Sequence, residues 1–192
     1  MDGAASIGEN KLTIGAVWYP VTVLGFGNRL GIWFQGCSRN CQNCISPEFK
    51  DYNAGHVLSV EELNEMLVRV EAIDGLTISG GEPFDQPEAL FRLITWFESK
   101  YNDDVLLFTG YTLEQLQKRN NPIIEAILNH ISVLIDGEYK DDMHSEVGLM
   151  GSYNQRIHVW KYRERYDSAE KLNREMQCVL LRDRIWMIGV PM

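Results

Sequence analysis

Three cysteines occur close together in the chain, at Cys37, Cys41 and Cys44, in the spacing C-x3-C-x2-C. They directly follow residues 30–34, an apolar run with the character of a buried strand. Three thiolates do not complete a site that needs four ligands. They can bind three irons of a [4Fe–4S] cluster and leave the fourth iron open to a second molecule. The spacing therefore predicts a cluster with one accessible iron.

Zinc and disulfide chemistry are the competing interpretations of these thiols. Zinc usually takes four closed ligands, often as two cysteine pairs, whereas the remaining cysteine, Cys178, stands alone far along the chain. The four histidines are scattered. A disulfide needs an oxidising compartment, which nothing in the sequence indicates. An iron–sulfur cluster is therefore favoured, and Cys178 is predicted to be a buried free thiol.

Length and composition suit a single-domain enzyme. The chain has 192 residues, of which 45% are hydrophobic, enough to bury a substantial core. Its net charge of −9 argues against broad nucleic-acid binding, which relies on basic surface. No apolar run approaches the ~18 residues of a membrane span. Residues 1–10 lack a signal-peptide pattern and are expected to be disordered. We expect a cytoplasmic protein without nucleic-acid or membrane partners.

Strand-like and helix-like segments alternate along the chain. Short apolar runs predict strands at residues 30–34, 76–78, 105–108, 131–135 and 156–160. Helices are expected to begin at Ser59, Asp85, Thr112 and Pro122. This order predicts an α/β fold with right-handed crossovers and a mostly parallel sheet. In such sheets the chemistry gathers at the carboxyl ends of the strands. We expect four segments to meet there: residues 37–44, 79–83, 109–111 and 136–137.

Two helix starts carry specific signals. Ser59 and Glu62 have the spacing of a capping box, and Asp85 is expected to cap the following helix with Glu88 at its third position. The apolar face expected for the helix after Ser59 consists of Leu63, Met66, Leu67 and Val70.

The tail differs from the rest of the chain. We expect a single domain over residues 1–192, with a core at about 18–160 and a C-terminal extension at 161–192. Residues 166–176 are charged and predicted to be helical. Residues 178–188 read as a hairpin, expected to cover an edge of the sheet.

The cysteines and the sequence Gly80-Gly81-Glu82-Pro83, in this order and at strand ends, resemble the radical S-adenosylmethionine (SAM) superfamily. The resemblance implies a partial (β/α)6-type barrel. It also implies a [4Fe–4S] cluster on Cys37, Cys41 and Cys44 whose open iron is chelated by SAM. In that superfamily one electron then cleaves SAM to methionine and a 5′-deoxyadenosyl radical, which removes a hydrogen atom from the substrate.

Residues 79–83 also have a physical reading as a ligand-binding segment. Gly80 and Gly81 remove side chains where backbone must approach a ligand closely. Their amide and carbonyl groups can hydrogen-bond an amino-acid-like moiety, and the Glu82 carboxylate can accept from an ammonium group. By resemblance this segment, with Ser79 before it, faces the methionine end of SAM.

A closer resemblance covers about residues 18–159 and is to the anaerobic ribonucleoside-triphosphate reductase activating proteins. It rests on residues 31–37, 109–112, 133–137 and 151–156. It implies that Thr109, Gly110 and Asp136 lie near SAM. The implied partners are a glycyl radical enzyme, the anaerobic ribonucleotide reductase, and a flavodoxin- or ferredoxin-type electron donor. For Asn154, Gln155 and Arg156 two roles stay open, shaping the pocket or satisfying loop backbone groups.

Two residues depart from the pattern of these activating proteins, so other functions remain as alternatives. Phe26 stands where these activases often have proline, and Asn43 stands before the third cysteine where many relatives carry an apolar or small residue. One alternative is a short radical SAM enzyme acting on a peptide or small molecule, similar to 7-carboxy-7-deazaguanine synthase. Another is a non-catalytic iron–sulfur or zinc module, which would explain the cysteines but not Gly80-Gly81-Glu82-Pro83.

Overall fold

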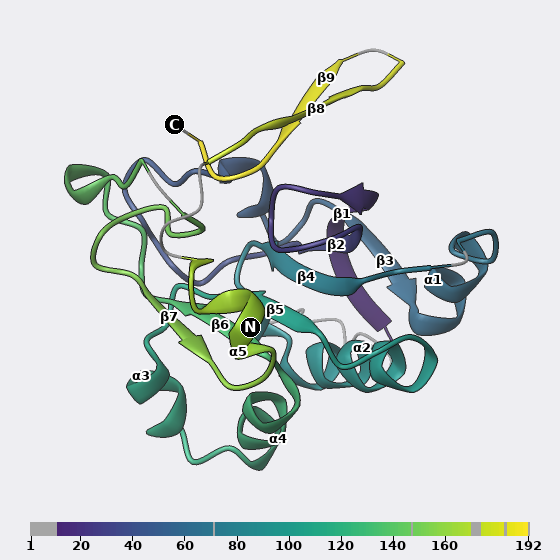
Figure 1. Ribbon diagram of the computed structural model, residues 1–192, viewed down its shortest axis with the longest axis horizontal. Coiled ribbons are helices and arrows are strands. Elements are labelled where there is room, and N and C mark those ends of the chain that lie inside the picture. The colour runs from purple at the N-terminus through teal and green to yellow at the C-terminus, as the bar shows by residue number, and fades with distance from the viewer. Residues whose placement is uncertain (1–10, 71, 147, 170–173, 183, 192) are drawn as a thin grey trace, which may run out of the picture.

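A computed structural model describes residues 11–70, 72–146, 148–169, 174–182 and 184–191. It has a central sheet with its larger helices packed on one side, and a short helix and a hairpin on the other (Figure 1). The predicted disorder of residues 1–10 lies outside the described residues. Within the described part of the chain, no helix is both long and apolar enough to cross a membrane.

The sheet has seven strands in the order β3-β1-β2-β4-β5-β6-β7. Neighbouring strands are parallel from β2 to β6, whereas β1 runs antiparallel to β2 and β3, and β7 runs antiparallel to β6. The strand bounds are Lys11–Val21 (β1), Arg29–Phe34 (β2), His56–Ser59 (β3), Gly75–Gly80 (β4), Val105–Phe108 (β5), Val133–Asp136 (β6) and Arg156–Val159 (β7). The predicted α/β fold and mostly parallel sheet are confirmed.

Two strands of the sheet were not predicted from the sequence, and the direction of a third strand differs from the prediction. Strands β1 and β3 were not predicted, and they form the antiparallel edge beside β2. The predicted strand at 156–160 exists as β7, but it runs antiparallel to β6. Residues 137–155 join these two strands, and the described residues among them, 137–146 and 148–155, contain one 3-10 turn, Asp141–Met143, and no α-helix. A connection without a crossover helix returns the chain antiparallel, because parallel neighbours need a long crossover.

In the part of the chain that the structure describes, five helices accompany the sheet: α1 (Val60–Met66), α2 (Pro87–Lys100), α3 (Leu113–Gln117), α4 (Pro122–His130) and α5 (Arg163–Tyr166). The predicted capping box at Ser59 and the starts at Thr112 and Pro122 are confirmed. Helices α1 to α4 bury their apolar sides against one face of the sheet, with Leu90 and Phe97 fully buried. The opposite face is therefore left for other elements.

Two predictions about the helices were wrong. Asp85 does not cap α2, which begins after Gln86 without a side-chain cap among the described residues. A 3-10 turn, Pro83–Asp85, intervenes and redirects the Asp85 side chain. Of the expected apolar face, Leu63, Leu67 and Val70 pack on the core as predicted, whereas Met66, where helix α1 ends, is 59% exposed.

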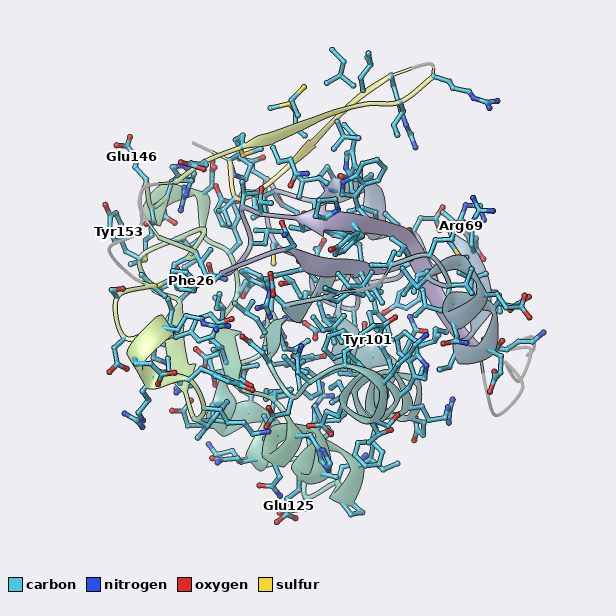
Figure 2. The ribbon with its side chains drawn as sticks, turned by 45° about the vertical axis from the view of Figure 1, so that its right-hand side comes forward. Phe26, Arg69, Tyr101, Glu125, Glu146 and Tyr153 are labelled. Carbon is cyan, nitrogen blue, oxygen red and sulfur yellow. The ribbon has the colours of Figure 1, made fainter. Side chains whose placement is uncertain are left out.

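The tail hairpin consists of β8 (Gln177–Leu180) and β9 (Ile185–Ile188) and confirms the predicted hairpin. It packs on the face of β1 and β2, not on an edge of the sheet as predicted: the Trp186 ring lies 4.9 Å from the Trp33 ring and 6.2 Å from the Trp18 ring. Gln177 also accepts from the Thr22 N–H at 3.1 Å, and Val179 and Ile188 are buried in the same cluster, whereas the tip of the hairpin projects from the body (Figure 2). Cys178 is exposed, contrary to prediction, because a two-stranded ribbon covers only its inner face.

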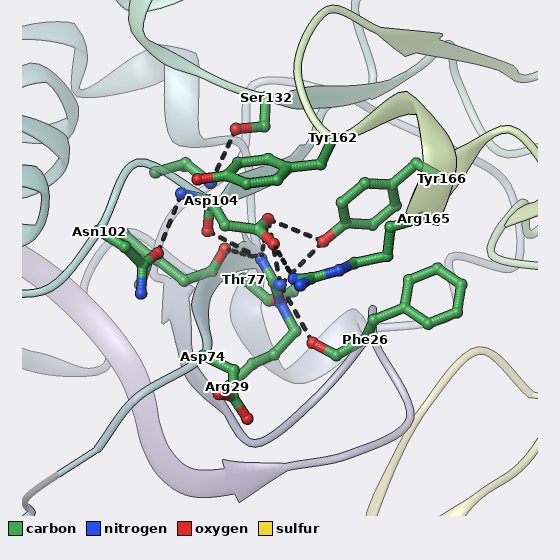
Figure 3. A network of polar contacts seen from close by, with 12 residues as sticks. Phe26, Arg29, Asp74, Thr77, Asn102, Asp104, Ser132, Tyr162, Arg165 and Tyr166 are labelled. Carbon is green, nitrogen blue, oxygen red and sulfur yellow. Dashed lines mark hydrogen bonds and ion pairs between the residues drawn. The ribbon is translucent and has the colours of Figure 1, made fainter.

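A buried polar network joins the amino ends of the central strands to the tail (Figure 3). The fully buried Arg29 guanidinium donates to Thr77 Oγ1 at 2.7 Å and to Tyr166 Oη at 2.8 Å, and it pairs with Asp104 at 3.2 Å. The predicted helix at 166–176 is wrong at both described ends, since α5 stops at Tyr166 and residues 174–176 are not helical. A division at residue 161 stays a prediction, although Tyr166 is integral to the core.

Candidate functional site

The cysteine loop leaves the carboxyl end of β2 and is fixed at its start by backbone hydrogen bonds. Gly36 donates its N–H to Phe49 O at 2.9 Å, and Cys37 donates to Lys50 O at 3.2 Å. These bonds run the first part of the loop alongside residues 49–50. The sequence predicted this position directly, because an apolar strand precedes the first cysteine.

Residues 81–82 follow β4 and pair with residues 34–36, where β2 passes into the cysteine loop. Gly81 donates its N–H to Phe34 O at 2.8 Å, and Glu82 donates to Gly36 O at 2.9 Å. A Cβ atom on Gly81 would lie 2.1 Å from the Gly36 carbonyl oxygen. Glycine is therefore required here by the close approach of two backbones inside the protein, whereas the sequence reading attributed it to an approaching ligand.

The Glu82 side chain joins two strand ends. Its carboxylate accepts from Thr109 Oγ1 at 2.8 Å and from the N–H of Gly110 at 2.8 Å, and also from Phe84 N–H at 3.0 Å. The residue is fully buried, and burial raises its pKa to about 7, although the three hydrogen bonds act in the opposite direction. Its predicted bond to a cofactor ammonium stays a prediction.

A pocket opens at the carboxyl ends of these strands, and nine of the ten predicted site residues line it. They are Cys37, Cys41, Cys44, Ser79, Gly80, Gly81, Glu82, Thr109 and Gly110. Phe108 and Leu149 supply apolar wall, and Val190, beyond the hairpin, completes that side. Segments far apart in the sequence therefore meet where the parallel sheet predicted.

Asp136 is the predicted site residue that does not line the pocket. Its fully buried carboxylate accepts from the Leu113 N–H at 2.6 Å and from Arg156 Nη2 at 2.6 Å, and its Oδ2 lies 3.0 Å from His158 Nε2. Burial by itself raises the pKa of Asp136, but Arg156 and the other partners lower it below its usual range. Asp136 thus links β6 to the start of α3, next to Gly137 in the pocket wall.

The three cysteines are half-buried and face one pocket. Burial raises the pKa of Cys37 to about 11, and its thiol donates to the Arg39 carbonyl at 3.6 Å. Burial likewise raises the pKa of Cys41. Among the described residues, no three His, Cys, Asp or Glu side chains converge as ligands of a single ion. The donor set fits a cluster, in which each thiolate binds its own iron and loses its proton on binding.

Sequence reasoning missed two cations in the pocket wall, Arg39 and Lys50. Arg39 lies between Cys37 and Cys41, so its place in the motif was an available signal. Its guanidinium lies 4.6 Å from the centre of the Tyr111 ring and 3.4 Å from a Glu138 oxygen. Lys50 carries no comparable signal, because it reaches the pocket through the pairing of residues 49–50 with the cysteine loop.

Residues 154–156 mainly satisfy hydrogen-bonding groups of the surrounding loops, which is one of the two roles considered for them. Gln155 accepts from the N–H of Gly151 at 2.7 Å and donates to Gly137 O at 2.7 Å, while Asn154 donates to Glu138 O at 2.8 Å. Gln155 also lines the pocket. Arg156 does not line the pocket and forms ion pairs with Asp136 and Glu114. These side chains satisfy backbone and neighbouring carboxylates, and one of them also shapes the pocket.

Comparison with known proteins defines the class first. Residues 23–158 match the model of the 4Fe-4S single cluster domain family. The matched region contains all three cysteines and the strand ends of the pocket.

The curated relatives are more specific: those from Enterobacteria phage T4, Haemophilus influenzae and Vibrio cholerae are each named anaerobic ribonucleoside-triphosphate reductase-activating protein. The chain is 27% identical to that of Enterobacteria phage T4 and 30% identical to that of Haemophilus influenzae, each covering 75% of this chain and 96% of the relative. It is 30% identical to that of Vibrio cholerae over 73% of this chain and 94% of the relative. The chain belongs to the family of these activating proteins.

Proposed function

We propose that this protein is a radical SAM enzyme that installs a glycyl radical on an anaerobic ribonucleotide reductase. The observation that carries the proposal is the meeting of the three cysteines with residues 79–82 and 109–110 on one pocket. The names of the relatives supply the target. No feature of the described residues favours a small-molecule substrate or a non-catalytic module.

Cys37, Cys41 and Cys44 would hold a [4Fe–4S] cluster with an open iron at the pocket. When bound, the cluster supplies the electron that cleaves SAM to methionine and a 5′-deoxyadenosyl radical. The backbone of Ser79–Gly81, which lines the pocket, would face the amino-acid end of SAM, and Thr109 and Gly110 would lie beside it. Arg39 and Lys50 are the cations in the pocket wall that can attract its carboxylate.

The surroundings of the pocket suit radical chemistry. The apolar side chains of Phe108, Leu149 and Val190 limit the entry of water, which would otherwise compete for reactive species. The packing of α1 to α4 on the face opposite the hairpin supports the partial-barrel description, in which helices cover the outside and the pocket lies within. A flavodoxin- or ferredoxin-type donor and a cytoplasmic, reducing location complete the proposal.

The test uses anaerobically reconstituted protein with dithionite and SAM. The expected products are 5′-deoxyadenosine, followed by chromatography, and a glycyl-radical doublet in the EPR spectrum once an anaerobic ribonucleotide reductase is added. Cys37→Ala, Cys41→Ala and Cys44→Ala should each abolish both. Cys178→Ala is the matched control, because this exposed thiol lies in the hairpin, and it should leave both unchanged. A fully loaded protein that yields neither product, with or without the reductase, would contradict the proposal.

A further inference from the structure

Asp85 holds the residue next to the first cysteine. Its carboxylate accepts from the Ser38 N–H at 2.6 Å and from Ser38 Oγ at 2.7 Å, and it also accepts from Tyr52 Oη at 2.6 Å. Ser38 directly follows Cys37 in the loop. The Tyr52 ring packs against Gly36 on the other side of Cys37, where an added Cβ would meet the ring at 2.4 Å. Through Ser38 and Tyr52, Asp85 therefore restrains the loop on both sides of Cys37.

Asp85 is itself held in place by the surrounding fold, so the hydrogen bonds that it accepts restrain the loop firmly. Asp85 ends the 3-10 turn Pro83–Asp85, which follows Glu82 directly, and Phe84 within that turn is buried. Glu82 is itself fixed to the ends of β4 and β5. The segment that lines the pocket thus continues into the residue that restrains Cys37. A restraint of this kind fixes a thiol relative to the place where the cofactor would lie.

We propose that Asp85 is a positioning residue that fixes the Cys37 thiolate relative to residues 80–82 and whose negative charge lowers the reduction potential of the cluster. This inference rests on the proposed function, because it concerns the same cluster. Hydrogen bonds to a carboxylate are stronger than neutral ones, so three of them restrain the loop effectively. The potential of an iron–sulfur cluster depends on nearby charge, and a fixed negative charge disfavours adding an electron.

Two substitutions separate geometry from charge. Asp85→Ala removes every acceptor, whereas Asp85→Asn keeps the shape and an acceptor oxygen but removes the charge. Glu88→Gln is the matched control, because this exposed carboxylate lies three residues further on and makes no hydrogen bond or ion pair with any residue that the structure describes. Circular dichroism and urea unfolding verify that each variant folds.

The first measurement is amide hydrogen exchange over residues 36–39 in the metal-free protein. Asp85→Ala should speed exchange at the Ser38 amide at least tenfold relative to wild type, and Glu88→Gln should leave it unchanged. The second measurement is the midpoint potential of the reconstituted cluster, followed by EPR. Asp85→Asn should shift that potential to less negative values, and Glu88→Gln should shift it less.

Unchanged exchange at Ser38 in Asp85→Ala would overturn the positioning role. A potential in Asp85→Asn that moves no more than in Glu88→Gln would overturn the electrostatic role. If Asp85→Ala does not fold, Asp85→Asn still tests the inference through the potential. Failure of the wild-type protein to bind a cluster would instead refute the proposed function, and the exchange measurement would still decide the positioning role without metal.

Discussion

Glu82 Oε1 accepts a hydrogen bond from Thr109 Oγ1 at 2.8 Å, which joins the carboxyl ends of β4 and β5 inside the protein. The carboxylate is fully buried, and its nearest partners are hydrogen-bond donors without charge. Burial raises its pKa from an ordinary 4.5 to about 7. The protonation of this buried carboxylate therefore couples the architecture of the pocket to pH.

The stability of the metal-free protein should depend on pH through Glu82. Between pH 4.5 and 7 the Glu82 carboxyl group stays protonated in the folded chain but is ionised in the unfolded chain. The stabilisation that comes from this difference is complete below about pH 4.5 and is lost as the pH rises through about 7. In Glu82→Gln this dependence disappears. The difference in unfolding free energy between wild type and Glu82→Gln should fall between pH 4.5 and 7, by up to about 1.4 kcal/mol per unit. Urea unfolding measures it, and a difference independent of pH would contradict the prediction.

Removing Asp104 should leave the buried Arg29 guanidinium without its charged partner. The two groups lie 3.2 Å apart with side chains 0% and 2% exposed. Breaking such a pair from one side costs about 3–5 kcal/mol, because an uncompensated charge stays buried. Asp104→Ala should therefore lower the unfolding free energy by that amount. Asp142→Ala, at an exposed carboxylate, is the control and should change it by less than about 0.5 kcal/mol. Equal effects of the two substitutions would refute this account.

Gly81→Ala should disturb both the fold and the cluster site. The new methyl group would meet the Gly36 carbonyl oxygen at 2.1 Å, and backbone cannot move aside as a side chain can. Overpacking of this kind costs about 1–3 kcal/mol. Iron content after reconstitution should fall as well, because Gly36 precedes Cys37. Gly110→Ala is a useful comparison, since its nearest atom, in the Arg39 side chain, lies at 3.1 Å and can move. A Gly81→Ala protein with full iron content and unaltered stability would argue against the close approach.

The packing of the hairpin on the sheet should depend on the Trp186 side chain. This side chain is partly buried against Trp33 and Trp18, so Trp186→Ala is expected to lower the unfolding free energy by about 2–3 kcal/mol, less than full burial would give. Leu180→Ala, on the outer face and 81% exposed, is the matched control and should have little effect. Thermal unfolding compares the two variants. A larger effect of Leu180→Ala would place the stabilising contact on the wrong face of the hairpin.

Local sequence determined much of this protein. The cysteine spacing, the apolar runs of β2, β4, β5 and β6, and the capping signals at Ser59 and Thr112 each act over a few residues, and the structure agrees with them. The order of strands and helices then brings the carboxyl ends together, so nine of the ten predicted site residues line one pocket.

Only the tertiary structure decided which partners the polar side chains take. Asp85 fits a helix-cap pattern, yet it bonds to Ser38, which lies 47 residues away in the chain. Asp136 lies at a strand end as predicted, yet Arg156 and the Leu113 N–H occupy its carboxylate. The buried pairing of Arg29 with Asp104 likewise joins the first residue of β2 to the residue before β5. Such contacts depend on which strands become neighbours and how each loop turns, and a local pattern carries no information about either.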